Sequence, residues 1–167
     1  MKTLIELHND IEARVQAIRD DNPDWLCQMG CDGCCHRLAQ IPELTPAEWA
    51  LLEKGLSTLS PATRQEIRKN VAMLATQLPR FIVCPMLDNK AGTCMVYAYR
   101  PIACRTYGFY VQRDKGLYCH DIESRVEQGE LNSVVWGNHD VIDRCLDKFG
   151  QKRNLVEWFD DYHEHIV

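Results

Sequence analysis

Hydrophobic residues recur at helical spacing near the start of the chain. The positions that share one face are Leu4, Leu7, Ile11, Val15 and Ile18. Charged residues occupy the rest of the helical wheel, which is typical of a helix with one buried side. The pattern predicts an amphipathic helix over residues 3–20.

A second helix is predicted from its start signals. Thr45 can cap the first turn, Pro46 suits the first helical position, and Glu48 completes a capping box. The apolar residues that follow predict a helix from these residues to about Gly55.

The pattern of apolar and polar residues then changes twice, from helical to strand-like and back to helical. A helical pattern that begins at Pro61 continues to Leu78, where Pro79 ends it. Residues 81–112 are rich in aromatic and β-branched residues interrupted by proline and glycine, which predicts short strands and loops. From residue 121 to the end the helical pattern returns.

Length and composition predict one domain. The chain has 167 residues, of which 46% are hydrophobic, enough for a core of its own. We expect a mostly α fold with short β or irregular segments, in which helices pack around a central cysteine cluster as a single metal-stabilised domain, 1–167. The cysteine-cluster core covers about 27–105, and a helical C-terminal part covers about 121–167.

The charge balance excludes some classes of partner. Lysine and arginine number 19 against 24 aspartate and glutamate residues, a net charge of −5. Because nucleic-acid affinity depends on clustered cations, we expect no nucleic-acid partner. No apolar run approaches the roughly 18 residues of a membrane span, and the first ten residues lack the apolar stretch of a signal peptide. We therefore expect a cytoplasmic protein with no membrane partner.

Nine cysteines are the main candidate chemistry. In a reducing compartment, clustered cysteines favour metal ligation over disulfides. Candidate ligands stand beside glycine, proline or arginine rather than at helical spacing. They are Cys31, Cys34, Cys35, Cys84, Cys94 and Cys104.

The spacing within this set suits a thiolate site. Cys31 and Cys34 form a CxxC pair that can converge on one ion across a turn, in which Gly33 allows a positive φ. Four thiolates around zinc or an iron–sulfur core leave a negative charge that needs compensation, and Arg100 and Arg105 are the nearest cations in sequence.

Four other residues have open roles. Cys27 is either a spare thiol or a ligand in a bulged loop, and His36 lies beside the cluster, where it could tune or ligate the metal. Cys119 and His120 could add ligands or could simply form a loop pair.

The set of motifs resembles a known family. Cys31-xx-Cys34-Cys35, Cys84-Pro85, the Cys94 segment and Arg100-Pro101-xx-Cys104-Arg105 are similar in order to the YkgJ-type cysteine cluster family, a zinc- or iron-chelating domain of CxxCxxCC type. The resemblance covers residues 31–105 and implies metal chelation by these cysteines. A related domain in flagellin lysine methylases implies an iron–sulfur centre as an alternative. Many members carry a further cysteine where this chain has Gln28.

Three functions remain open from the sequence. The first is a metal-binding protein that holds zinc or iron, with a [4Fe-4S] cluster as one form, and that serves a protein partner. The second is an iron–sulfur oxidoreductase or electron-transfer protein. The third is a thiol-based redox sensor in which Cys34 with Cys35, or Cys27, forms a disulfide. No catalytic motif is found, so an enzymatic role would depend on the metal centre.

Overall fold

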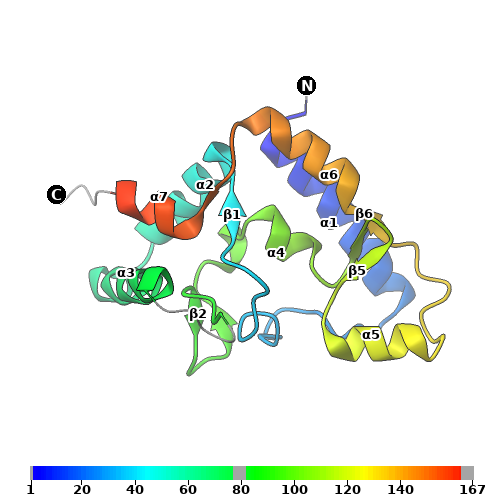
Figure 1. Ribbon diagram of the computed structural model, residues 1–167. Helices are drawn as coiled ribbons and strands as arrows, with labels where there is room; N and C mark the ends of the chain where they lie inside the picture. The colour runs from blue at the N-terminus through cyan, green and yellow to red at the C-terminus, as the bar shows by residue number, and fades with distance from the viewer. Residues whose placement is uncertain (1, 77–81, 163–167) are drawn as a thin grey trace. The chain divides into compact units, whose positions relative to one another are not determined.

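The computed structural model describes residues 2–76 and 82–162 and is mostly helical with small sheets (Figure 1). The mostly α class is therefore confirmed. The chain divides into two compact units, Met1–Cys31 with Pro101–Phe149 and Asp32–Arg100 with Gly150–Val167. Each unit is described by itself, and the formation of one domain around a central metal site stays a prediction.

The first unit begins with helix α1, Leu4–Asp21, which confirms the helix predicted over 3–20. Thr3 and Glu6 form a capping box, in which the Glu6 carboxylate accepts a hydrogen bond of 2.6 Å from the Thr3 amide. This bond satisfies one of the amides that a helix start leaves unpaired. The apolar stripe read from the sequence is the buried face of α1.

Four further helical segments and three strands complete the first unit. The helical segments are α4 (Ile102–Thr106), α5 (His120–Glu127), α6 (His139–Leu146) and the 3₁₀ helix η2 (Asp147–Phe149). The strands are β4 (Tyr110–Gln112), β5 (Lys115–Leu117) and β6 (Gly137–Asn138). They form a sheet in the order β5-β4-β6, with β4 antiparallel to β5 and parallel to β6.

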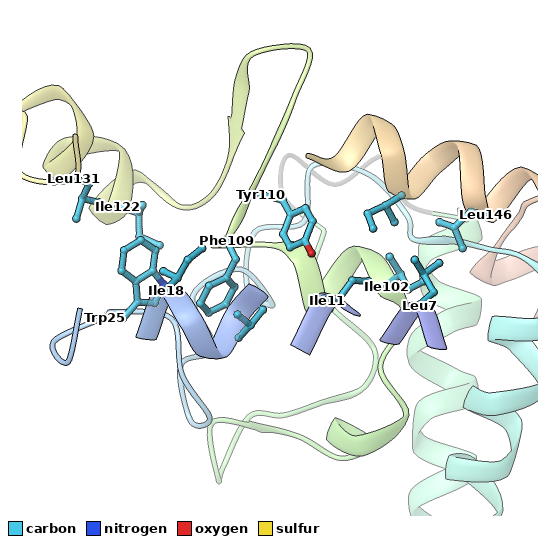
Figure 2. Packing of buried hydrophobic residues seen from close by; sticks show 12 residues of the cluster. Leu7, Ile11, Ile18, Trp25, Ile102, Phe109, Tyr110, Ile122, Leu131 and Leu146 are labelled. Atoms are coloured by element: carbon cyan, nitrogen blue, oxygen red, sulfur yellow. The ribbon is translucent and has the colours of Figure 1, made fainter. Parts of the chain in front are cut away.

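The core of the first unit lies between α1 and the elements that cover its apolar face (Figure 2). Ile11 of α1 and Ile102 of α4 are completely buried there. Trp25 stacks on Phe109 with ring centroids 5.8 Å apart. Helix α6 lies beside α1 and buries Ile142 against the same core. The alternation of apolar and polar positions in α1 thus determines which side of the helix meets its neighbours.

The second unit contains three α-helices, one 3₁₀ helix and two pairs of short strands in its described part. The helices are α2 (Pro46–Ser57), α3 (Pro61–Thr76), η1 (Tyr97–Tyr99) and α7 (Leu155–Asp161). The antiparallel strand pairs are β1 (Glu43–Leu44) with β7 (Arg153–Asn154), and β2 (Leu87–Asp88) with β3 (Thr93–Cys94).

The predicted start of α2 is confirmed in detail. Thr45 is completely buried, and its amide donates a 2.9 Å hydrogen bond to the carboxylate of Glu48. Helix α3 begins at Pro61 as predicted, and its described part ends at Thr76. The predicted continuation to Leu78 and the stop at Pro79 lie outside the described residues.

Aromatic side chains fill the core of the second unit. Trp49 of α2 stacks on Trp158 of α7 with ring centroids 5.5 Å apart, and Phe159 packs edge-on against Trp49. Gly55 lets α2 approach η1 closely, because a Cβ at this position would lie 2.6 Å from the ring of Tyr99. Cys84 and Cys94 are partly buried and pack against this core.

One part of the sequence prediction needs correction. Residues 81–112 were expected to form only short strands and loops, but they also contain η1 and the one-turn helix α4. Pro101 is the N-cap of α4, and its carbonyl accepts a hydrogen bond from the amide of Cys104. Tertiary packing of Ile102 stabilises a helix this short, which local propensity alone does not predict. Among the described helices, none has both the length and the apolar composition needed to cross a membrane.

Candidate metal centre

Four of the six predicted ligands belong to the second unit. Cys34 and Cys35 lie in a tight turn that begins at Asp32, whose carbonyl accepts hydrogen bonds from the amides of Cys35 (2.9 Å) and His36 (3.2 Å). The turn therefore carries two thiols on consecutive residues. Both side chains are partly buried.

A short antiparallel pairing brings Cys84 to this turn. The amide of Cys84 donates a 2.7 Å hydrogen bond to the carbonyl of Cys35, and the amide of Leu38 donates a 2.9 Å bond to the carbonyl of Ile82. Leu38 and Ile82 form an antiparallel bridge. Residues 44 and 49 positions apart in sequence therefore meet through backbone hydrogen bonds, and Cys84 is held beside Cys35.

The β2–β3 hairpin adds the fourth cysteine. Leu87 pairs with Cys94 across the hairpin, and the amide of Leu87 donates to the carbonyl of Cys84 at 3.1 Å. Asp88 stabilises the turn by accepting hydrogen bonds from the next amides along the chain, and Gly92 there has a φ of +64°. The hairpin thus connects Cys84 and Cys94 through a few fixed residues.

The predicted role of Gly33 is wrong. Gly33 is not among the glycines with positive φ, and a Cβ there would meet no atom within 4 Å. The glycine that the site requires is Gly92, where a Cβ would lie 3.2 Å from a carboxylate oxygen of Asp32. The turn at Cys34 is formed by hydrogen bonds to the Asp32 carbonyl, which do not need a left-handed residue at position 33.

Hydrogen bonds link three of the thiols in a row. The thiol of Cys34 donates to Cys35, and this bond, followed by burial, raises the pKa of Cys34 far above its ordinary value. The bond accepted from Cys34 lowers the pKa of Cys35, but donation to Cys84 together with burial outweighs it and raises the pKa to about 12. Burial also raises the pKa of Cys94, which interacts electrostatically with Cys34. The raised pKa values of Cys34, Cys35 and Cys94 favour the neutral thiol at each of these residues.

Arg100 supplies the positive charge near this cluster. Its guanidinium lies over the ring of Tyr97, 3.5 Å from the centroid, and its Nε donates to the Tyr97 carbonyl at 2.9 Å. The charge of Arg100 acts to lower the pKa of both Cys34 and Cys94, against the burial that raises it. The role of Arg100 as a counterion to thiolates stays a prediction.

The other two predicted ligands, Cys31 and Cys104, belong to the first unit. Cys31 is exposed, and Cys104 lies half-buried on α4. Arg105, on the same helix, interacts with His8 of α1: burial, and then the charge of Arg105, lower the pKa of His8 to about 4. All six cysteines, with Arg100 and Arg105, stay predictions as parts of a metal site. Among residues 2–76 and 82–162, no three histidine, cysteine or acidic side chains are already arranged as metal ligands.

The residues with open roles have different surroundings. The Cys27 thiol donates to the carbonyl of Tyr107 at 3.6 Å, and a Cβ on Gly108 would lie 2.8 Å from its sulfur. Cys119 is the N-cap of α5, and His120 is exposed and lies 3.6 Å from Glu123.

His36 lies in the same turn as Cys34 and Cys35. Its Nε2 lies 3.0 Å from a carboxylate oxygen of Asp32. Asp32 is a residue that sequence reasoning missed, although its place between Cys31 and Cys34 was a visible signal. Asp32 and His36 both belong to the turn that contains Cys34 and Cys35, so their contact can stabilise the conformation of that turn.

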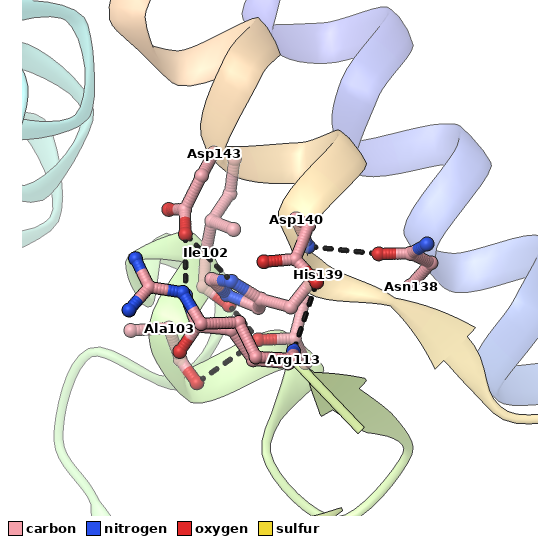
Figure 3. A network of polar contacts seen from close by, with 9 residues as sticks. Ile102, Ala103, Arg113, Asn138, His139, Asp140 and Asp143 are labelled. Carbon is pink, nitrogen blue, oxygen red and sulfur yellow. Dashed lines mark hydrogen bonds and ion pairs between the residues drawn. The ribbon is translucent and has the colours of Figure 1, made fainter. Parts of the chain in front are cut away.

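A second polar cluster lies in the first unit, on α6 and the β4–β5 hairpin (Figure 3). His139 is 8% exposed, and its Nδ1 lies 3.4 Å from Asp143, whose carboxylate also accepts a hydrogen bond from Gln112. Asp140 accepts a 2.9 Å bond from the amide of Arg113. These contacts attach the hairpin to the start of α6. The sequence carried no signal for the bonds of Gln112 and Arg113, because their partners come from a separate segment.

Comparison with known proteins identifies one family. The chain matches the CxxCxxCC family, described as "Putative zinc- or iron-chelating domain", over residues 26–132. Comparison with curated proteins gives no match, and comparison with solved structures gives none either. The matched region covers more than half of the chain and includes every predicted ligand. The chain therefore belongs to the CxxCxxCC family of zinc- or iron-chelating domains.

Proposed function

We propose that this protein binds zinc or iron through clustered cysteine thiolates. The observation that supports the proposal most directly is the gathering of Cys34, Cys35, Cys84 and Cys94 from three segments of the second unit. Cys31 and Cys104 are added as ligands from the sequence motif. The family match supports zinc or iron as the metal.

The side chains near the four cysteines fit such a metal. The donor set is sulfur, which zinc and iron accept, and it is partly buried beside one arginine. A bound cation would replace the protons that the thiols now share, so metal uptake releases protons.

The proposed role of the metal is structural. A closed thiolate site has no open position for substrate, and metal binding would stabilise the second unit by about 10 kcal/mol or more. The molecule would then serve as a cytoplasmic interaction module for a protein partner. In this arrangement Arg100 offsets part of the negative charge of the thiolates.

An iron–sulfur centre is the second candidate. Cys34 and Cys35 are adjacent in sequence, and a multinuclear centre offers separate iron atoms to two such ligands. A cluster of this kind would supply electron transfer, and Arg100 and the Tyr97 ring would influence its potential. The same cysteines support either assignment.

Metal and acid-labile sulfide analysis of protein purified without oxygen tests the proposal. Stoichiometric zinc without colour supports the structural site, whereas iron with sulfide and a broad visible band near about 400 nm supports the cluster. Aerobic handling can exchange iron for zinc, so the purification must exclude oxygen. Protein that takes up neither metal, even when zinc or ferrous iron is added to the reduced chain, would contradict the proposal.

A further inference from the structure

The Asp32 carboxylate has a defined orientation in the turn that carries Cys34 and Cys35. Its oxygen Oδ2 accepts a 3.0 Å hydrogen bond from Nε2 of His36, and the Asp32 carbonyl accepts bonds from the amides of Cys35 and His36. An ionised carboxylate can only accept, so His36 supplies the proton of the side-chain bond. The backbone and the side chain of Asp32 are therefore both bonded within the same turn.

The same carboxylate oxygen faces the β2–β3 hairpin. A Cβ at Gly92 would lie 3.2 Å from Oδ2 of Asp32 and 3.9 Å from its Cγ, so the carboxylate would have to move to accommodate a side chain there. Gly92 has a φ of +64°, and its amide donates a 2.8 Å hydrogen bond to the carbonyl of Asp88. Cys94 follows two residues later in β3. Asp32 thus lies against a hydrogen-bonded part of the segment that carries Cys94.

Two contacts of different kinds therefore connect the cysteine turn to its neighbours. The bond from the Cys84 amide to the Cys35 carbonyl connects it to the Cys84 segment, and the approach of Asp32 to Gly92 connects it to the hairpin. We infer that the Asp32 carboxylate, held by His36, positions the cysteine turn against the β2–β3 hairpin, so that the thiols of both segments are arranged before a metal binds. This inference rests on the proposed function, because it takes these thiols as ligands.

Two other roles for Asp32 are less consistent with its surroundings. Charge alone does not favour a carboxylate in this turn, because a negative charge disfavours the ionised form of nearby thiols. Direct ligation is the other alternative, since carboxylate oxygen binds zinc, but Oδ2 is already bonded to His36. Positioning requires only a side chain of this shape with an acceptor oxygen, charged or neutral. The three roles therefore predict different results for asparagine and alanine at this position.

Zinc competition titrations of the reduced full chain separate the three roles. Asp32→Asn keeps an oxygen that accepts from His36 and should retain most of the zinc affinity. Asp32→Ala removes the contacts of the side chain and should weaken zinc binding by about tenfold. If the charge of Asp32 were decisive, both variants would bind zinc more tightly than the wild-type chain. If Asp32 were a ligand, both would lose affinity to the same extent, and either pattern would overturn the inference.

A matched pair of variants at His36 tests the other half of the contact. His36→Gln places a side-chain amide donor near the position of Nε2 and should retain zinc binding, whereas His36→Ala releases the carboxylate and should weaken binding severalfold. Glutamine does not replace histidine as a zinc ligand, so equal losses in the two variants would identify His36 as a ligand and overturn the inference. Glu66→Ala, which removes an exposed carboxylate of α3, is the control and should leave the affinity unchanged.

Urea unfolding of the metal-free variants shows whether the fold itself has changed. The unfolding midpoints should stay close to that of the wild-type chain, and a loss of affinity seen only in variants that are unfolded without metal would overturn the positioning role. If Asp32→Ala does not fold, the His36 pair decides, because the His36 side chain is 45% exposed and its replacement leaves the turn backbone intact.

The wild-type chain separates this inference from the proposed function. A wild-type chain that binds neither zinc nor iron would overturn the proposed function and the inference together. A wild-type chain that binds zinc, beside a folded Asp32→Ala variant of equal affinity, would overturn the inference alone.

Discussion

Both units contain cysteines, but the surroundings of these residues differ. In the second unit, Cys34, Cys35 and Cys84 interact with one another through hydrogen bonds, and Arg100 lies close enough to influence Cys34. In the first unit, three cysteines are partly buried against the apolar core. They are Cys27, Cys119 and Cys145.

The backbone explains this difference. The thiols of the second unit are carried by a turn, an antiparallel pairing and a hairpin, which bring separate segments within a few ångströms. Cys119 and Cys145 belong to helices α5 and α6, as N-cap and interior residue, and each packs on the core that its helix covers. The number of cysteines therefore does not by itself indicate a metal site. The backbone must also bring the cysteines close to one another.

The largest expected effect comes from removing a thiol of the second unit. Cys35→Ser should weaken zinc or iron binding on the order of 100-fold or more, because a ligand is lost from a site with few alternatives. Cys145→Ser, the matched change in the first unit, should leave the metal content unchanged. The measurement is a competition titration against a chelator of known affinity. Equal losses in both variants would remove the distinction between the two groups of cysteines.

The next effect concerns the packing role of Cys27. Gly108 has a φ of +91°, and a Cβ there would lie 2.8 Å from the Cys27 sulfur, so Gly108→Ala should lower the free energy of unfolding by about 2 kcal/mol. Metal stoichiometry should stay unchanged. Gly33→Ala is the control and should change stability by less than about 0.5 kcal/mol, because its Cβ meets no neighbour. Urea titrations provide both values, and a greater loss for Gly33→Ala would contradict the assignment.

The two arginines of the motif allow a sharper comparison. Arg100→Gln removes the charge that favours the thiolates of Cys34 and Cys94 and should weaken metal binding by about tenfold. Arg105→Gln removes a charge that acts on His8 and should have a smaller effect. Competition with a chelator measures the metal affinity of both variants. The titration is repeated at several salt concentrations, because salt screens an effect of charge. A greater loss for Arg105→Gln would assign the counterion role to that residue instead.

The smallest expected effect is a pH dependence of stability that originates in the first unit. The pKa of His8 is about 4 in the folded chain and 6.5 when unperturbed, so the unfolded chain takes up the proton first as the pH falls. The neutral His8 side chain therefore contributes fully to the free energy of unfolding above pH 6.5, and this contribution is lost as the pH falls toward 4. The loss is about 1 kcal/mol, because solvent screens this half-buried group.

Urea unfolding of His8→Leu at about pH 7 and about pH 5 checks this expectation. The variant should lose part of the decrease that the wild-type chain shows between the two conditions. His120→Gln is the control, because the His120 side chain is 85% exposed. An unchanged pH dependence in His8→Leu would show that another group is responsible.

Much of the helical structure could be predicted because its signals are local. The apolar stripe of α1 and the capping box at Thr45 each depend on residues within one or two turns, and both are confirmed. Helix α4 was missed because a helix of five residues is stabilised by the burial of Ile102 rather than by its own propensity. The hydrogen bonds from Gln112 to Asp143 and from Arg113 to Asp140 were also missed, because in each bond the two partners lie in separate segments.

For the candidate site, the sequence by itself determined the residue types and the family. The spacing of cysteine, proline and arginine can be recognised in the sequence without knowledge of the fold. Only the tertiary structure decided that Cys84 meets Cys35, that Gly92 rather than Gly33 adopts the left-handed conformation, and that Arg100 lies near the thiols. The physical reason is that such contacts depend on hydrogen bonds and close approaches between distant segments. Sequence spacing cannot specify these before the chain folds.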